Sequence, residues 1–403
     1  MIISLKNEFN EAISVEFKLA VQTSFSVAEK YGFEIFLIGG IVRDLILKNP
    51  LKDIDIAVQG DAVEFAKALE KEGFKILNIQ ENLRTAKVEF SNNVVIDFAS
   101  TREENYIQSG VLPLAYNFGC TLEKDVQRRD FSINTLAMNF NYELVDYCSG
   151  YDDLVNKKIR ILHEKSFIDD PSRIIRTLKF KERFNFEIDD NTFELMQNYL
   201  KEVNSDMPLE RIKSELKQYF EIKKEGLYER FIQSNAYKLI SDNPIKEFDE
   251  SILAKLSEYE LYDDSEKWFL YIILLVVNSD FAIDRLNMNS FEKKILKETR
   301  SLLQKEIIED KVAVYNLFND LTGLSIAIYY VLTQNKMVKM FLDALKDIKI
   351  LINGKDLIDL GFLPSPYFNK LFDVVLKEKL DGKLKTKEEE INFVKQFIEK
   401  EEG

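Results

Sequence analysis

The fold of this chain is constrained most by one stretch near the N-terminus, FLIGGIVRDLILKNPLKDIDIAVQGDA, which spans residues 36–62. An apolar run ends there at Gly39 and Gly40, and a short helical segment follows. Asp53 and Asp55 then alternate with isoleucines, which predicts a half-buried strand with both carboxylates on one face, because strand side chains alternate in direction. Like charges this close repel each other unless a cation lies between them. The stretch therefore predicts a strand, a glycine turn, a helix and a second strand that presents a charged site.

Length and composition narrow the classes of protein that remain. With 403 residues the chain exceeds one ordinary core, so we expect roughly two to four domains. It has no run of about 18 apolar residues and no basic-then-apolar leader, so we expect no membrane association and a cytoplasmic location. Two cysteines and one histidine argue against a disulfide framework and against a multi-histidine zinc site. The net charge of −14 argues against a protein that coats nucleic acid by charge alone, but it allows an enzyme with a local basic surface.

The predicted secondary structure changes from mixed strands and helices to helices alone well before the middle of the chain. In the first part we expect a helix over residues 1–30, another over 61–73 with Asp61 as its N-cap, and about five short strands. From Asp169 onward nearly every segment has helical periodicity, with few glycines and prolines. A final unit begins with a turn region at Leu351 and ends in a charged amphipathic helix. The sequence thus predicts a small α+β head followed by an all-helical arm.

The glycine pair and the two aspartates have a joint chemical interpretation. A glycine turn at the start of a helix lets backbone N–H groups approach a phosphate, and Arg43, one turn into that helix, can neutralise it. A hard divalent ion such as Mg²⁺ binds through one or two carboxylates together with substrate phosphates. We therefore predict that Asp53 and Asp55 are the catalytic metal ligands and that Gly39, Gly40 and Arg43 bind a nucleotide. The alternative is a solvent-facing edge strand with two surface aspartates beside an incidental glycine turn.

Further motifs follow in a fixed order, namely RRDFSINTLAMN (residues 128–139), DDPSRIIRTLKF (169–180) and PLERIKSEL (208–216). Together with GGIVRD…LKDIDI, they resemble the class II tRNA nucleotidyltransferase and bacterial poly(A) polymerase family, within the polymerase-β-like nucleotidyltransferase superfamily. The matches are to motif A, to R-R-D-F-T-I-N-A, to E-D-x-x-R with Asp169 in place of the usual Glu, and to E-R-I-x-x-E-L. INGKDLIDLGFLPSP is similar to the tail of many bacterial members.

The resemblance implies a polymerase-β-like nucleotidyltransferase head, with a mixed five-stranded sheet and helices, followed by an all-α neck, body and tail. We expect four parts: a catalytic head over 1–160, a helical neck that recognises the nucleotide base over 161–225, a helical body over 226–345, and a helical, tRNA-binding tail over 346–403. The implied chemistry is nucleotidyl transfer with Mg²⁺ and release of pyrophosphate.

The resemblance also assigns roles to charged residues of the head. It implies that Arg128 and Arg129 reach the triphosphate and that Asp130 and Asn134 face the ribose, where a carboxylate can accept from a 2′-hydroxyl. The alternative for the R-R-D group is a salt-bridged helix cap, which is worth little energetically. Asp97, in VVIDFAS, is placed to be a third metal ligand beside the aspartate pair, and a structural aspartate at a strand end is an equal alternative.

The third motif places Arg173, Arg176, Lys179 and Arg183 on one basic face of a predicted helix. An ordinary solvated face is the alternative. The resemblance implies instead that Asp170 and Arg173 hydrogen-bond the Watson–Crick edge of the incoming base, which favours C and A because both carry an exocyclic amino group. It implies that Arg176 holds the template or the phosphates and that Lys179 also lies at the nucleotide, where the family usually has arginine.

The leading interpretation is template-independent addition of CMP and AMP, from CTP and ATP, to the 3′ end of tRNA, as CCA addition or repair. The nearest alternative is a partial enzyme that adds only CC or only A, because the loop contains SGVLP (109–113) where many complete enzymes carry D-G-R-x-P. A poly(A) polymerase is disfavoured because the acidic C-terminus has no strongly basic extension. An RNA-binding scaffold with an inactive head is a fourth alternative, which the complete set of motif residues argues against. The sequence does not fix the oligomeric state.

Overall fold

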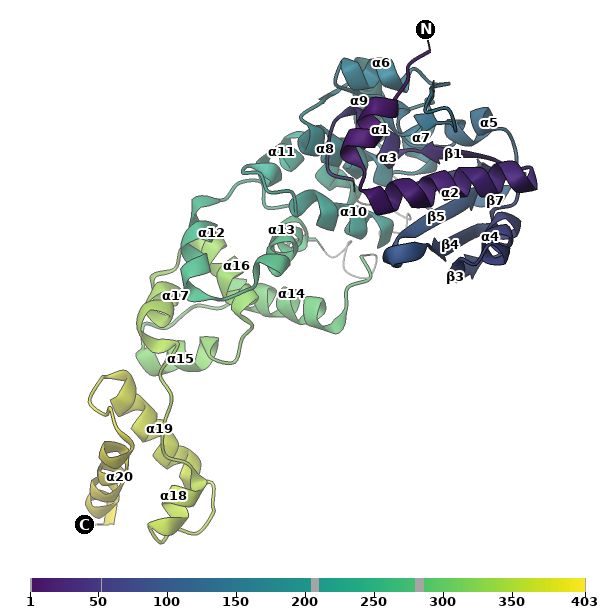
Figure 1. Cartoon of the computed structure of the whole chain (residues 1–403). Helices are drawn as coiled ribbons and strands as arrows, with labels where there is room; N and C mark the ends of the chain where they lie inside the picture. The colour runs from purple at the N-terminus through teal and green to yellow at the C-terminus, as the bar shows by residue number, and fades with distance from the viewer. Residues whose placement is uncertain (1, 52, 204–209, 280–285, 403) are drawn as a thin grey trace. The chain divides into compact units, whose positions relative to one another are not determined.

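The computed structural model describes residues 2–51, 53–203, 210–279 and 286–402 (Figure 1), so Pro208 and Leu209 of the fourth motif lie outside the described residues. The chain divides into two compact units. Unit 1 comprises Met1–Lys224 and Phe231–Leu239, and unit 2 comprises Glu225–Arg230 and Ile240–Gly403. The expected division into head, neck, body and tail is finer than this and stays a prediction.

Unit 1 is built around a mixed sheet of seven strands, which confirms the predicted α+β class and exceeds the five strands expected. The strand order is β3-β4-β5-β2-β1-β8-β9, and neighbours are antiparallel except for the parallel pair β2 and β5. The strands are β1 (Glu34–Ile38), β2 (Asp55–Gln59), β3 (Lys75–Gln80), β4 (Thr85–Glu89), β5 (Val95–Ser100), β8 (Ala137–Met138) and β9 (Leu144–Val145). A separate hairpin joins β6 (Glu103–Asn105) to β7 (Leu114–Tyr116).

The N-terminal segment forms two helices where one was predicted. They are α1 (Lys6–Ala12) and α2 (Val15–Tyr31). Ser14 lies between them with extended backbone, and its hydroxyl accepts a hydrogen bond from the Phe17 N–H. A serine in this position satisfies a free N–H at the start of a helix, so it begins α2 as a separate helix.

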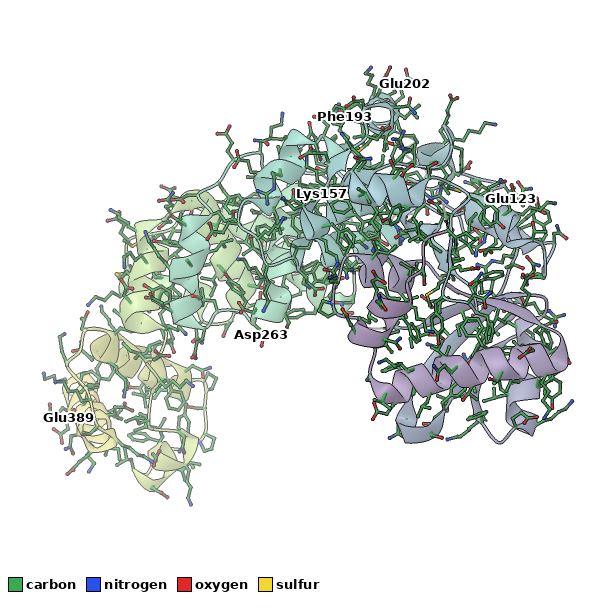
Figure 2. The ribbon with its side chains drawn as sticks, turned by 45° about the horizontal axis from the view of Figure 1, so that its top comes forward. Glu123, Lys157, Phe193, Glu202, Asp263 and Glu389 are labelled. Carbon is green, nitrogen blue, oxygen red and sulfur yellow. The ribbon has the colours of Figure 1, made fainter. Side chains whose placement is uncertain are left out.

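Helix α4 (Ala62–Lys71) begins where the sequence predicts. The Asp61 carboxylate accepts from the N–H groups of Val63 and Glu64, which confirms it as the N-cap. The buried face of α4 includes Phe65, whose ring packs edge-on against Phe98 of β5 at 5.2 Å between centroids. Charged side chains such as Glu123, Lys157 and Glu202 lie on the outside of the unit (Figure 2).

The rest of unit 1 is largely helical and positions the charged motifs. Its helices include α3 (Gly40–Ile46), α5 (Leu122–Gln127), α6 (Gly150–Val155), α7 (Ser166–Asp169), α8 (Ser172–Phe184), α9 (Asp190–Tyr199) and α10 (Glu210–Phe220). Helix α8 carries the third motif and packs along α10, which carries the described part of the fourth. A short parallel pair, β10 (Lys158–Ile159) and β11 (Glu187–Ile188), closes this region.

The regular secondary structure of unit 2 is entirely helical among its described residues. Its helices include α12 (Ser251–Leu256), α13 (Lys267–Val276), α14 (Ser290–Leu303), α15 (Lys311–Phe318), α16 (Gly323–Thr333), α17 (Lys336–Met340), α18 (Gly354–Asp359), α19 (Tyr367–Leu380) and α20 (Lys387–Glu402). The apolar run in α13 is buried, as the sequence predicts for a core helix. Among the described residues, no helix combines the length and the apolar character needed to cross a bilayer.

Candidate active site

The glycine pair forms the turn between β1 and α3. Gly39 has φ +78°, a backbone conformation that glycine adopts without strain. A Cβ at Gly39 would lie 3.2 Å from Nη1 of Arg129, so a larger residue would also press on that guanidinium. The Gly39 N–H donates to the Leu136 carbonyl at 2.9 Å and is therefore not free for a phosphate. The predicted phosphate contact at this turn stays a prediction and would depend on Gly40.

Arg43 lies one turn into α3, as expected, but it is anchored by protein groups. Its guanidinium donates to the Asp44 carboxylate and to Oδ1 of Asn134. It also lies over the rings of Phe184 and Phe180, at 4.6 and 5.5 Å from their centroids. Only 5% of Arg43 is exposed. Arg43 thus holds Asn134 and the two phenylalanine rings together at one side of the site. Its predicted contact with a phosphate stays a prediction.

The two aspartates have the alternation that the sequence predicts. Asp55 begins β2, Asp53 lies two residues before it, and both are exposed while Ile54 and Ile56 are buried. Asp97 of β5 is the register partner of Asp55 in the parallel pair, so the third predicted carboxylate lies beside the first two. The geometry thus brings Asp55 and Asp97 to neighbouring positions on one sheet.

A lysine occupies part of this charged surface. Lys87 of β4 is the register partner of Asp97, and its Nζ lies 2.9 Å from Asp97 Oδ2. Lys87, Asp97 and Asp55 therefore form a row across three adjacent strands. Among the described residues, no group of three or more carboxylate, histidine or cysteine side chains is arranged to hold a metal ion. Lys87 contacts only Oδ2 of Asp97, which leaves Oδ1 without a contact to this lysine.

The row lines a hollow of about 420 Å³, here called the carboxylate cavity, together with Gly39, Gly40, Arg128 and Arg129. Although Asp55 is exposed at its outer side, desolvation by the surrounding walls, reinforced by the nearby Asp97 charge, raises its pKa, while Arg129 opposes the rise. A bound cation would relieve this repulsion, and carboxylate oxygens are the donors that hard divalent ions prefer. The donor chemistry of Asp53 and Asp55 therefore fits a divalent metal.

Asp125 organises both arginines of the R-R-D motif. Its carboxylate is 1% exposed and accepts from Arg128 Nε at 2.9 Å, from Arg129 Nη2 at 3.1 Å and from the Arg102 N–H at 3.1 Å. Burial alone would raise the pKa of Asp125, but the two arginines hold it below its ordinary value. Arg128 also donates to Glu104 at 2.9 Å. The arginines are thus held at the edge of the carboxylate cavity by buried carboxylates.

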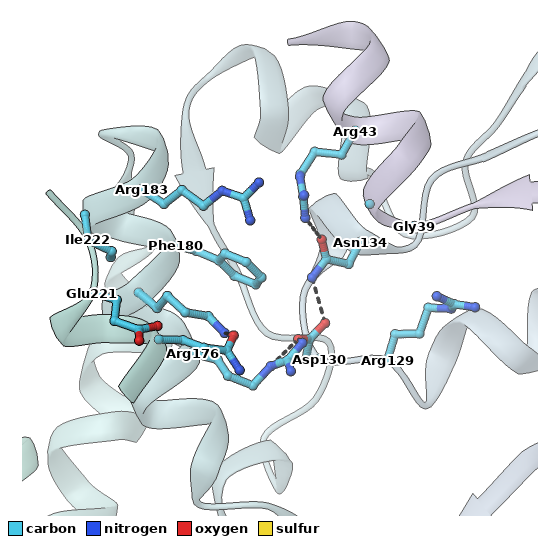
Figure 3. Close-up of a pocket in the computed structure, with 13 residues that line it drawn as sticks. Gly39, Arg43, Arg129, Asp130, Asn134, Arg176, Phe180, Arg183, Glu221 and Ile222 are labelled. Carbon is cyan, nitrogen blue, oxygen red and sulfur yellow. Dashed lines mark hydrogen bonds and ion pairs between the residues drawn. The ribbon is translucent and has the colours of Figure 1, made fainter. Parts of the chain in front are cut away.

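A second hollow of about 550 Å³, the basic cavity, lies on the other side of Arg129. Its lining, drawn in Figure 3, is dominated by cationic and amide side chains and comprises Gly39, Gly40, Arg43, Arg129, Asp130, Asn134, Arg176, Lys179, Phe180, Arg183, Gln218, Glu221 and Ile222. Gly39, Gly40 and Arg129 line both cavities. Nε of Arg129 is buried and has no hydrogen-bond partner in the described part of the chain, so this junction contains an unsatisfied donor.

Asp130 and Asn134, predicted to face the ribose, do lie in the basic cavity. Asp130 accepts from Asn134 Nδ2 at 2.9 Å and from Arg176 Nε at 2.8 Å, and Figure 3 shows the chain of contacts from Arg43 through Asn134 and Asp130 to Arg176. Burial would raise the pKa of Asp130, but Arg176 holds it below its ordinary value. Burial would lower the pKa of Arg176, but Asp130 and Glu215 raise it. This pair stays charged and fixes one wall of the cavity.

The face of α8 is not an ordinary solvated face. Lys179 is 8% exposed, and its Nζ contacts Glu215 and donates to Gln218 Oε1 at 2.8 Å. Arg176 donates to the same Glu215 at 3.2 Å. Burial, the largest effect, lowers the pKa of Lys179 despite Glu215. Only Arg183 of this face is largely exposed, which leaves it as the most accessible cation of α8.

Asp170 and Arg173, predicted to read the base, are buried and line neither cavity. Asp170 accepts from the Ser172 hydroxyl and from Arg211 Nη2, both at 2.6 Å. Arg173 donates to Ser166 Oγ at 2.7 Å, and to Tyr106 Oη and the Arg128 carbonyl, each at 3.1 Å. Base recognition by this pair would require exchange of these partners, and it stays a prediction.

Three residues that organise the site were not identified from the sequence. They are Asp125, Lys87 and Glu215. Asp125 lies in α5, four residues before Arg129, which follows the end of that helix, and the i,i+4 spacing of opposite charges was a usable signal. Glu215 belongs to the fourth motif but meets Lys179 across 36 residues, and Lys87 meets Asp97 only through strand register, so no local pattern reveals either contact.

Comparison with known proteins identifies the head. The model of the poly A polymerase head domain family matches residues 35–160. The CCA-adding enzyme of Staphylococcus epidermidis is 30% identical over 316 residues, which cover 75% of each chain. The A-adding tRNA nucleotidyltransferase of Halalkalibacterium halodurans is 28% identical over 92% of this chain and 90% of its own length.

The likeness extends along the whole chain. The A-adding tRNA nucleotidyltransferase of Geobacter sulfurreducens is 28% identical over 91% of this chain, but this chain spans only 45% of that longer protein. The solved structure of the Thermotoga maritima CCA-adding enzyme, complexed with tRNA, covers 99% of both chains with a TM-score of 0.77 and 23% identity, which establishes a common fold. From the fold, the ordered motifs and these relatives, the chain belongs to the class II tRNA nucleotidyltransferase family.

Proposed function

We propose that this chain adds CMP and AMP, from CTP and ATP, to the 3′ end of tRNA. The observation that carries the proposal is the junction of the two cavities, where Gly39, Gly40 and Arg129 line both. A triphosphate bound at this junction has its phosphates beside the unpartnered Arg129 Nε and its α-phosphate next to Asp55. The ribose and the phosphates farther from Asp55 then lie in the basic cavity.

In this reaction the tRNA 3′-oxygen forms a bond to the α-phosphorus of the nucleotide. The bond from that phosphorus to the oxygen bridging to the β-phosphate breaks, pyrophosphate leaves, and the 3′-hydroxyl loses its proton. Arg128 and Arg129 are fixed by Asp125, so they present positive charge to the phosphates without having to order themselves during the reaction. Asp130, held by Arg176, is placed to accept from the ribose hydroxyl.

Members of this family depend on a divalent metal ion. We propose that Asp53 and Asp55 hold it here and that the ion is Mg²⁺, because both carboxylates are exposed and the repulsion at Asp55 favours a cation. When bound, such an ion supplies Lewis-acid activation of the attacking hydroxyl and neutralises charge on the leaving pyrophosphate. Asp97 is a further ligand through Oδ1, or through Oδ2 if its contact with Lys87 opens.

We also propose that Asp170 and Arg173 select the base and that Arg176 and Lys179 lie at the nucleotide. Support comes from the match of these residues to the E-D-x-x-R motif and from the contact of Arg173 with the Arg128 carbonyl, which links the base-selecting motif to the phosphate-binding one. The cytoplasmic location and the tRNA-binding role of the tail stay predictions from the sequence.

The test uses radiolabelled CTP or ATP and three tRNA transcripts, which lack the whole CCA end, lack only the final A, or are complete. CCA addition labels the first transcript with both nucleotides and the second with ATP alone. Labelling of unrelated RNA with long A tracts would indicate a poly(A) polymerase. No labelling of any transcript by the folded protein would contradict the proposal.

A second candidate is addition of A alone. It is favoured by the A-adding relatives from Geobacter and Halalkalibacterium, whose alignments cover 91% and 92% of this chain. The same assay separates the two activities, because an A-adding enzyme labels only the transcript that lacks the final A and leaves CTP unused.

A further inference from the structure

Helix α14 in unit 2 carries a stripe of lysines that the catalytic chemistry does not use. An Asn289–Glu292 capping box begins the helix, and Ile295, Leu296, Thr299 and Leu302 are buried on one face. The opposite face presents Lys293, Lys297 and Ser301 at successive i+4 positions, Gln304 and Lys305 follow directly past the end of the helix, and all of them are exposed. From Lys293 to Ser301 the stripe runs along about 12 Å of helix.

The stripe lacks its own counter-charge. In the described part of the chain, Lys293, Lys297 and Lys305 form no ion pair, and the i,i+4 spacing of the first two destabilises the helix by like-charge repulsion. Glu298 of the same helix pairs with Lys294 at 3.6 Å and accepts from the Thr322 hydroxyl at 2.7 Å and from the Ser325 hydroxyl at 2.9 Å, and it forms no ion pair with the three lysines. A stripe of free lysines is unexpected in a chain whose net charge is −14.

The surface along the stripe is hollowed. Two depressions of about 440 and 420 Å³ lie along α14, and both are lined by Lys297 and Ser301. The first also includes Lys294 and Lys305, and the second includes Lys293. A polyanion that lies along these depressions can therefore contact the lysine ammonium groups. Ser301 and Gln304 add hydrogen-bonding groups beside them.

We propose that the lysine stripe of α14 (Lys293, Lys297 and Lys305) binds the phosphate backbone of the tRNA body, away from its 3′ end. The inference rests on the proposed function. RNA duplexes are held mainly through phosphates and 2′-hydroxyls, which lysine, serine and glutamine side chains match. A membrane surface is the competing partner, because Phe291 and Leu303 of the same helix are also exposed, but the stripe itself consists of polar side chains, which match phosphates and hydroxyls rather than lipid chains.

The stripe contrasts with the tail, to which tRNA binding was assigned from the sequence. Tail lysines are often paired with carboxylates: Lys379 with Glu390, Lys383 with Glu378 at 2.7 Å and Lys387 with Asp356 at 2.6 Å. Lys355, Lys377 and Lys400 are exposed there and form no ion pair with other described residues. The tail therefore supplies a matched set of charges with which to test the assignment.

The experiment measures binding of full-length protein to a tRNA transcript lacking CCA, by fluorescence anisotropy at several NaCl concentrations. The triple variant K293Q/K297Q/K305Q is compared with K355Q/K377Q/K400Q, which removes the same charge. Each lost phosphate contact reduces the slope of log K against log salt by about 0.7 to 0.9, so the α14 variant should lose about 2 to 3 from the slope and bind on the order of 10- to 100-fold more weakly at 0.1 M salt.

The K293R/K297R/K305R variant keeps the charge and should bind like wild type. CTP affinity should be unchanged in every variant, which shows that the fold of unit 1 is intact. The proposal is overturned if the α14 variant keeps the wild-type slope, if the tail variant loses as much, or if anionic vesicles bind wild type more tightly than tRNA. If wild type neither binds tRNA nor extends it, the proposed function itself fails; if it extends tRNA but the α14 variant binds normally, only this inference fails.

Discussion

Replacing Asp125 with asparagine removes one charge from the buried cluster that holds the two arginines of the R-R-D motif. Asparagine has nearly the same shape and keeps one acceptor oxygen, so the change is mainly electrostatic. Arg129 loses its ion partner, whereas Arg128 keeps Glu104. We expect unit 1 to be destabilised and the arginines to be less firmly positioned.

The magnitude follows from burial. Removing one partner of a fully buried ion pair costs about 3–5 kcal/mol. Here the arginine side chains are 18% and 21% exposed, so water replaces part of the lost interaction, and we expect about 2–3 kcal/mol. For a unit of this size that corresponds to a fall in Tm of roughly 4–12 °C. The KM for CTP should also rise, because the phosphate-binding cations lose their support.

The pH dependence gives an independent check. The pKa of Asp125 is below its ordinary value in the folded protein, so its contribution to stability is present above the unfolded pKa of about 3.9 and is lost as pH falls below it. The difference in Tm between wild type and D125N should therefore be full at pH 7 and should shrink at pH values below about 4.

The assay is thermal unfolding followed by circular dichroism, with D152N as the control, because Asp152 is exposed and its substitution should leave Tm within about 1 °C. A D125N variant that melts with the control at pH 7, or a difference that grows as pH falls, would refute the electrostatic role assigned to Asp125.

Three further changes test other parts of the account. D55A should remove detectable transfer without altering the circular dichroism spectrum, and near-normal turnover would contradict its role as a metal ligand. R173A should relax nucleotide choice or weaken CTP and ATP binding. Y106F removes one hydrogen bond to Arg173 and should change the same quantities in the same direction, by a few-fold to about tenfold. Unchanged fidelity and affinity in both variants would make Arg173 purely structural. E390Q should destabilise the tail by about 2–4 kcal/mol, because the buried Glu390 accepts from the Leu351 and Ile352 N–H groups and pairs with Lys379, and equal melting of E390Q and the exposed-site variant E388Q would argue against this.

Local patterns in the sequence were sufficient for much of the head. The alternation around Asp53 and Asp55 and the N-cap at Asp61 depend on neighbouring residues, and the structure confirms both. The break at Ser14 was missed because apolar periodicity continues on both sides of it. Strand β3 was missed because most of its side chains are exposed, so it has little hydrophobic alternation to detect.

The contacts between motifs could not be predicted in the same way. The sequence indicates cations on α8, but it does not indicate that Glu215 pairs with two of them or that Arg173 is enclosed by Ser166 and Tyr106. These contacts join segments far apart in the chain and depend on how the helices pack. For the same reason, the free Nε of Arg129 and the junction of the two cavities are found only in the structure.

If the carboxylates and the Arg129 junction form one nucleotidyl-transfer site, nucleotide addition and pyrophosphate release must occur together. Mass spectrometry of intact tRNA, incubated with the protein, CTP, ATP and Mg²⁺, measures the first, and a pyrophosphate assay of the same reaction measures the second. We expect tRNA to gain whole nucleotide masses at its 3′ end, with one pyrophosphate released for each, and D55A to give neither product. A tRNA of unchanged mass with the folded wild-type protein, or equal extension by wild type and D55A, would contradict this expectation.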